Sequence, residues 1–270
     1  TPLPSGFDTH LPHEMDPTDP ERQPETDSGH EYSPVLKKEE HNRYRSLVGS
    51  LQYFANCLRP DVAHAANALA QVAHCPRERH WKAALHCLKY LSGTPDLALH
   101  YSADSHGETL LGFTDSDFAG CKGTRRSTTG WMFTMAGGPV AWKSKRQEVI
   151  TLSSCEAEYR ALTSTVQEAM WLRDLLAELG WKVGRPTLIH CDNEAAVRIS
   201  RDPVNRAKTK HAALSFLFVR EQQALGKVKV IPVGTKQQTA DYLTKGVTRV
   251  TAENCKRLAG QSTAPPVQKK

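Results

Sequence analysis

The stretch Thr187-Leu188-Ile189-His190-Cys191-Asp192-Asn193 predicts a short buried strand that runs directly into an acidic residue. A carboxylate in this position lies at the carboxyl edge of a sheet, where its neighbours are other strand ends and helix starts. Adjacent residues of a strand face opposite sides, so His190 and Cys191 are not expected to form a metal-ligand pair. Asp192 is therefore the candidate functional residue of this stretch.

The segments on either side alternate between strand and helix patterns. Further strand patterns occupy residues 97–101, 109–114, 130–135, 140–142 and 227–233, with Gly137-Gly138 as a hairpin turn. Helix patterns occupy residues 153–180, 193–200, 212–225 and 237–245, and Ser153 or Ser154 caps the first of these. From residue 109 on, the order predicts an α/β domain with a mixed five-stranded sheet flanked by helices, and excludes an all-parallel doubly wound sheet.

A small all-helical segment, residues 43–100, precedes this domain, which is expected to occupy residues 101–250. Apolar residues recur in the helical segment at intervals of three and four, which predicts three short amphipathic helices with a break at Arg59-Pro60-Asp61. Residues 1–42 hold seven prolines and almost no aromatic side chains, which predicts a disordered leader. Residues 251–270 are expected to form a tail.

Charge is distributed unevenly along the 270 residues. The leader contains ten acidic and three basic residues, a net charge of −7, whereas the whole chain carries +6. The other 228 residues therefore carry +13. Such an excess suits a polyanion such as a nucleic acid, and it equally fits a solvated basic surface that has no partner.

Composition excludes several classes of protein. The mean hydropathy is −0.51, and no run approaches the roughly 18–20 apolar residues that a membrane span requires. The seven cysteines include no Cys-x-x-Cys pair, which argues against a disulfide framework or a zinc site and favours a reducing compartment. The beginning Thr1-Pro2-Leu3-Pro4 contains no secretory signal, so we expect a fragment of a longer protein that is not secreted.

Four acidic segments lie where a strand ends or a helix begins, at residues 113–117, 153–159, 189–193 and 239–243. Each acid alone has an ordinary structural explanation, as a turn residue, an N-cap or a first-turn acid favoured by the helix dipole. Brought together they would repel one another, and a hard divalent cation is the usual resolution. Two such cations can activate a water molecule and stabilise the leaving oxygen in phosphodiester hydrolysis.

Eight motifs follow one another in a distinctive order, at residues 44–51, 114–120, 126–130, 142–147, 152–159, 191–193, 209–211 and 240–245. Together they resemble the C-terminal part of a copia-type retrotransposon polyprotein. The resemblance implies that residues 43–100 are the end of a reverse transcriptase and that a ribonuclease H-like domain follows. It implies cleavage of the RNA strand of RNA–DNA hybrids with two Mg²⁺ ions, or with Mn²⁺. It also implies association with the polymerase portion of the same polyprotein, in a cytoplasmic virus-like particle or in the nucleus.

The resemblance assigns metal-binding and catalytic roles to Asp115, Glu158, Asp192 and Asp241. Glu158 is preferred to Glu156 because it begins the Glu-x-x-Ala pattern of the family. The two glutamates lie two positions apart, about 200° around a helix, and cannot point the same way. Asp117 shares a strand face with Asp115 and is the expected outer acid.

Departures from the family pattern also have consequences. Many ribonucleases H carry a histidine shortly before the last aspartate, whereas residues 233–241 contain none. The acid and second histidine usual after a Thr-Lys-His motif are also missing after His211, which suggests relaxed constraint or an inactive copy. The paired aspartates of a polymerase site are absent, so this chain is not expected to synthesise DNA alone.

Contacts with a nucleic acid are predicted at basic and polar positions near these motifs. The candidates are Lys145, Arg146, Asn193, Lys210 and His211, and each has the alternative of a solvated surface residue. Trp131 and Trp142 are expected in the core. The competing function is a catalytically inactive or repurposed fragment that only binds nucleic acid, and a related integrase core fits the motifs less well. The sequence does not determine the oligomeric state.

Overall fold

The computed structural model describes residues 1–4, 7, 33–102, 110–201 and 210–263, although not the side chains of residues 210–213. A five-stranded sheet forms its centre, with the strand order β4-β3-β2-β5-β6. The strands are β2 (Leu111–Asp117), β3 (Thr128–Met135), β4 (Gly138–Arg146), β5 (Thr187–Cys191) and β6 (Val228–Pro232). The first three pair antiparallel, whereas β5 runs parallel to both β2 and β6. The predicted mixed five-stranded sheet flanked by helices is confirmed.

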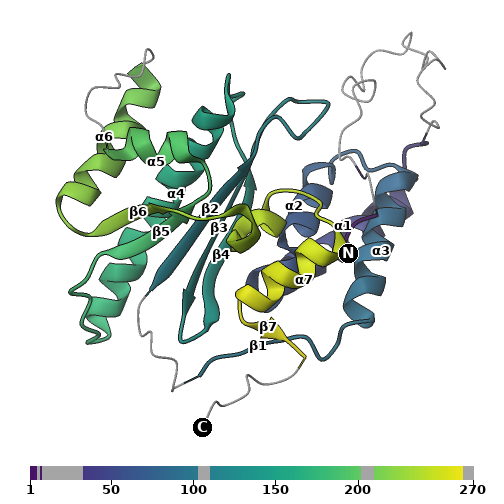
Figure 1. The fold of residues 1–270 in the computed structure, drawn as a ribbon. Helices are drawn as coiled ribbons and strands as arrows, with labels where there is room; N and C mark the ends of the chain where they lie inside the picture. The colour runs from purple at the N-terminus through teal and green to yellow at the C-terminus, as the bar shows by residue number, and fades with distance from the viewer. Residues whose placement is uncertain (5–6, 8–32, 103–109, 202–209, 264–270) are drawn as a thin grey trace.

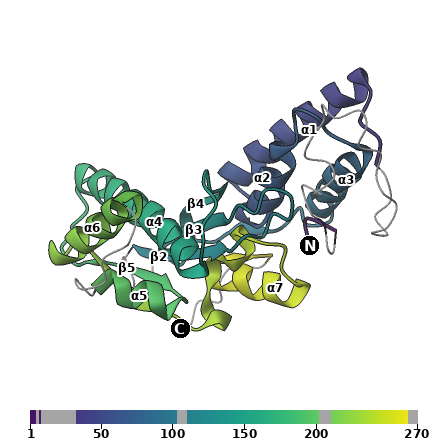
Figure 2. The same cartoon turned by 90° about the horizontal axis from the view of Figure 1, so that it is seen from above.

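Helices cover both faces of the sheet (Figures 1 and 2). One face carries α4 (Ser154–Glu178), with α5 (Glu194–Arg201) and α6 (Lys210–Ala224) beside it. On the other face, α2 (Ala63–Gln71) and the short helix η5 (Thr239–Leu243) contact the sheet directly. Packed against α2 are α1 (Lys38–Cys57), α3 (Glu78–Ser92) and η3 (Pro60–Val62), whereas α7 (Arg249–Leu258) packs against η5 and η4 (Thr235–Gln237). The described residues form two hydrophobic cores, one on each face of the sheet, and β3 contributes side chains to both. Trp131 and Phe133 pack against α4, whereas Met132 points to the other face and packs with the helical segment.

Sequence patterns explain most of these elements. The Ser153 side chain caps α4 by accepting a hydrogen bond from the backbone N–H of Glu156 at 3.1 Å, as expected of one of the two serines. The hairpin between β3 and β4 turns at Ala136 and Gly137, both of which have positive φ. Trp131 is buried in the core as predicted, whereas Trp142 is partly buried against the helical segment, where its indole donates to the carbonyl oxygen of Ala55 at 2.7 Å. None of the helices within the described ranges is long and apolar enough to cross a membrane.

The boundaries differ from the prediction at three places. Helix α1 begins at Lys38, inside the expected leader, because Glu39 and Glu40 form its first turn. Most of the leader, residues 8–32, lies outside the described residues. The strand expected at residues 97–101 is reduced to β1 (Ala98–Leu99), which pairs with β7 (Gln261–Ser262) and does not join the main sheet. The expected tail instead contributes most of α7 and all of β7, because buried Cys255 and Ala259 pack into the core of the helical segment.

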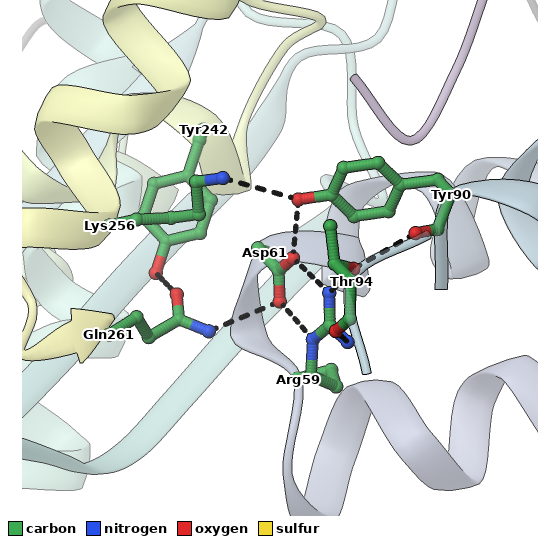
Figure 3. Close-up of polar contacts among 7 residues, drawn as sticks. All are labelled: Arg59, Asp61, Tyr90, Thr94, Tyr242, Lys256 and Gln261. Carbon is green, nitrogen blue, oxygen red and sulfur yellow. Dashed lines mark hydrogen bonds and ion pairs between the residues drawn. The ribbon is translucent and has the colours of Figure 1, made fainter. Parts of the chain in front are cut away.

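A buried polar cluster joins the helical segment to α7 and β7 (Figure 3). Arg59 and Asp61 form a bidentate ion pair with distances of 2.9 and 2.8 Å. Asp61 also accepts hydrogen bonds from the Tyr90 hydroxyl at 2.8 Å and from the Gln261 amide at 3.1 Å. The Tyr242 hydroxyl donates to Gln261 at 3.2 Å. The helical segment and the end of the chain are thus linked by hydrogen bonds between residues 200 positions apart.

Candidate active site

Three aspartates converge at the carboxyl edge of the sheet. Asp115 lies in β2, and Asp192 directly follows β5, whose Cys191 pairs with Thr114 in the parallel register. The two acids are therefore neighbours on adjacent strands. Asp241 comes from η5, which packs against β2 and β3. One carboxylate oxygen from each aspartate lies within 4.8 Å of those of the other two. The structure thus brings together three acids that are 126 residues apart along the chain from first to last.

Glycine at position 130 allows η5 to come this close to the sheet. Gly130 lies opposite Asp115 in β3. A Cβ atom at this position would lie 2.5 Å from Cγ2 of Thr244 and 2.9 Å from Cβ of Leu243. Both distances are too short for real carbon contacts, so any larger residue would push η5 and Asp241 away.

Glu158 is the fourth acid at this edge. It lies in the second turn of α4, is buried, and accepts a hydrogen bond from the backbone N–H of Ser116 at 3.3 Å. Its second oxygen, Oε2, has no hydrogen-bond partner within the described part of the chain. A buried carboxylate oxygen without a partner is costly, and a bound cation would supply one.

Glu156 points elsewhere, as the helical spacing requires. Its carboxylate pairs with Arg160 at 3.0 Å and accepts the backbone N–H of Leu152 at 3.1 Å. These contacts stabilise the start of α4. The structure therefore places Glu158 beside the aspartates and Glu156 outside the cluster.

Two residues that the sequence left without a role complete the surroundings of the aspartates. The buried Thr244 hydroxyl donates a short hydrogen bond to Asp115. The Lys245 ammonium lies 3.0 Å from Oδ1 of Asp241 and 3.8 Å from Oδ2 of Asp115. Both residues fall within the motif at residues 240–245, which is the only signal in the sequence that points to them. Asp117, at the end of β2, adds to the negative field around Lys245.

Burial, and to a smaller extent the charges of neighbouring acids, raises the pKa values of Asp115, Glu158 and Asp192. Burial raises the pKa of Asp115 to about 6, with Lys245 and Thr244 opposing this rise and the other two aspartates adding to it. Burial and the charges of Asp115 and Asp192 raise the pKa of Glu158 to about 9. Burial and the nearby Asp241 raise the pKa of Asp192. Burial alone would lower the pKa of Lys245, but Asp115 and Asp241 together raise it.

These properties fit a divalent cation. The donors are carboxylate oxygens alone, which hard cations such as Mg²⁺ and Mn²⁺ prefer. Burial is the largest cause of the raised pKa values of Asp115 and Glu158, and a bound cation would stabilise the charged carboxylates that burial disfavours.

The predicted substrate contacts lie in different settings. Lys145 and Arg146 end β4, and Lys145 pairs with Glu148 at 3.0 Å on the exposed surface. The Asn193 side chain accepts the backbone N–H of Ala196 at 3.0 Å and so caps α5. Lys210 and His211 begin α6, and their side chains lie outside the described residues.

Comparison with known proteins identifies the relatives of this chain. No family model matches it. The Retrovirus-related Pol polyprotein from transposon RE2 of Arabidopsis thaliana is 40% identical over 223 residues, which are 83% of this chain and 15% of that protein. The corresponding polyprotein from transposon TNT 1-94 of Nicotiana tabacum is 39% identical over 217 residues, 80% of this chain and 16% of that protein. The chain therefore spans about one sixth of the length of these relatives.

One solved structure that is similar to this chain is that of LC11-RNase H1, isolated from compost. It is 17% identical with a TM-score of 0.40, and the match covers 51% of this chain and 94% of that one. The two polyproteins match at about 40% identity over some four fifths of the chain. These similarities confirm the predicted resemblance to a copia-type retrotransposon polyprotein.

Proposed function

We propose that this chain is the ribonuclease H portion of a retrotransposon Pol polyprotein and hydrolyses the RNA strand of RNA–DNA hybrids. The observation that carries the proposal is the convergence of Asp115, Asp192 and Asp241 within 4.8 Å, with buried Glu158 beside them. Aspartates too far apart to share a cation would have favoured the alternative, a catalytically inactive fragment that only binds nucleic acid.

The four acids would hold two Mg²⁺ ions, or Mn²⁺, through their carboxylate oxygens. Divalent cations bound there lower the pKa of a water molecule and offset the charge that develops on a phosphate during hydrolysis. Thr244 keeps Asp115 oriented toward Asp241, because its hydroxyl donates to the Asp115 carboxylate and its backbone N–H donates to the carbonyl oxygen of Asp241 at 3.2 Å. Glu158, with its pKa of about 9, keeps its proton at neutral pH until a cation compensates its charge.

The proposed partners follow from charge and from family membership. The sequence after residue 42 carries +13, which favours a polyanionic hybrid as substrate. Lys145 and Arg146 end a strand of the same sheet, and we assign them to phosphate contacts. The helical segment, joined to the sheet domain by buried contacts, corresponds in this proposal to the end of the reverse transcriptase. The polymerase portion of the same polyprotein is then its partner, in a cytoplasmic virus-like particle or in the nucleus.

The test of this proposal is a cleavage assay that compares three duplexes of one sequence. End-labelled RNA paired with DNA should be cut in the presence of Mg²⁺ to products with 5′-phosphate and 3′-hydroxyl ends. The same RNA paired with RNA, and the DNA duplex, should stay intact. Binding of the hybrid without cleavage by folded protein would establish the inactive alternative instead.

A further inference from the structure

Lys245 places a positive charge beside the converging aspartates, whose negative charges repel one another when no metal is bound. Its ammonium is 3.0 Å from Asp241 and 3.8 Å from Asp115, so it contacts two of the three converging aspartates. The position is fixed by the preceding residue, because the buried Thr244 hydroxyl donates to Asp115 and the Thr244 backbone N–H donates to the carbonyl oxygen of Asp241. Lys245 follows directly and is held against the same two acids.

The ammonium and a divalent cation would compete for the same oxygens. A lysine ammonium only donates hydrogen bonds, so it offers a metal no ligand and repels it at short range. Its carbon chain is flexible, and the Lys245 side chain is 42% exposed, so a path away from the aspartates is open to it. Occupation of Asp115 and Asp241 by a metal therefore requires the ammonium to move.

A cavity next to Lys245 can accept the displaced ammonium. Lys245 also lines a cavity of about 510 Å³ between η5, α7 and the helical segment. Arg249 and Lys256 line the same cavity, together with the acid Asp61 and with Tyr90 and Tyr242. The cavity is therefore a space into which the Lys245 ammonium can turn when it leaves the aspartates.

We propose that Lys245 is a positioning residue that holds Asp115 and Asp241 together in the metal-free protein and is displaced into the neighbouring cavity when a divalent cation binds. The inference rests on the proposed function, because it takes the aspartates as the metal site. It predicts that Lys245 opposes metal binding while it stabilises the metal-free fold.

The test measures metal binding by the full chain without reference to cleavage. Lys245→Met should lower the melting temperature in metal-free buffer, and Mg²⁺ should restore it toward that of the unchanged protein. The Mg²⁺ concentration at half-maximal stabilisation should fall by about tenfold or more, because one positive charge is removed from the immediate surroundings of the metal. Lys236→Met, which removes the same charge from an exposed position in η4, should leave both quantities unchanged.

A second variant keeps the test decisive if Lys245→Met does not fold without metal. Lys245→Arg retains the charge and should keep the metal dependence of the unchanged protein, and Lys245→Met refolded in Mg²⁺ should still titrate at lower metal concentration by calorimetry. Unchanged or weaker Mg²⁺ binding by Lys245→Met would overturn the inference, as would the absence of any Mg²⁺ effect on either protein. The proposed function is tested separately, by the cleavage assay. If it is wrong, the RNA–DNA hybrid stays uncut, whatever the Mg²⁺ titration shows.

Discussion

Asp61 provides a sharp test of how the helical segment is joined to the rest of the chain. Its side chain is 3% exposed, that of Arg59 is 8% exposed, and the two form a bidentate pair. Asp61→Asn preserves the shape but leaves the Arg59 guanidinium buried without a counter-charge. Removal of one partner from a buried ion pair costs about 3–5 kcal/mol. The hydrogen bonds of Asp61 with Tyr90 and Gln261 are weakened as well, because their acceptor loses its charge.

Urea unfolding of the purified chain measures this cost as a change in the free energy of unfolding. The matched control is Glu39→Gln, which removes the charge from an ion pair of similar distance, 2.9 Å, on the surface of α1. Those two side chains are 81% and 68% exposed, so the loss should stay below about 1 kcal/mol. The double variant Arg59→Met/Asp61→Leu should lose less than Asp61→Asn, because no buried charge remains. A loss below about 1 kcal/mol for Asp61→Asn would refute the reasoning.

Three further variants test the acid cluster and its support. The pKa of Glu158 is raised from 4.5 to about 9, so in metal-free buffer its contribution to stability is present below pH 4.5 and is lost as the pH rises toward 9. The melting temperature of the unchanged protein should therefore fall over that pH range. Glu158→Gln should make this fall smaller. Glu156→Gln, which affects only the Arg160 pair and the helix start, should cost about 1 kcal/mol or less in urea unfolding and keep most of the cleavage activity. Gly130→Ala should cost about 1–3 kcal/mol through its clash with Thr244 and Leu243, and should weaken Mg²⁺ binding in a calorimetric titration; unchanged binding would contradict the role given to this close approach.

Local sequence signals were sufficient for the sheet and its acids. Asp192 follows a short apolar run, and the position of an acid at a strand end depends only on that strand. The spacing of Glu156 and Glu158 also shows that the two must diverge, but helical geometry does not determine which one faces the sheet. That choice came from the Glu-x-x-Ala pattern, and the structure places Glu158 on the side of the aspartates.

Tertiary contacts explain what the sequence could not reveal. The Arg59-Pro60-Asp61 run indicates a helix break, but it does not reveal that Asp61 also accepts a hydrogen bond from Gln261, 200 residues further along the chain. Residues 251–263 resemble a tail by composition, yet their few apolar side chains find a core that only the folded helical segment provides. Lys245 has the composition of a surface residue, and its role as a counter-charge arises only because η5 packs against Gly130.

The most direct test of the central claim is the rate of RNA cleavage in a saturated RNA–DNA hybrid complex in Mg²⁺, compared between the unchanged chain and Asp192→Asn. Loss of one metal-binding carboxylate removes several kcal/mol of transition-state stabilisation, so the rate should fall roughly a thousandfold or more. Hybrid affinity measured separately in Ca²⁺ should change little, because the basic surface is intact. Equal cleavage rates for the two proteins, or no cleavage by the unchanged chain, would contradict the assignment of this acid cluster as a ribonuclease H centre.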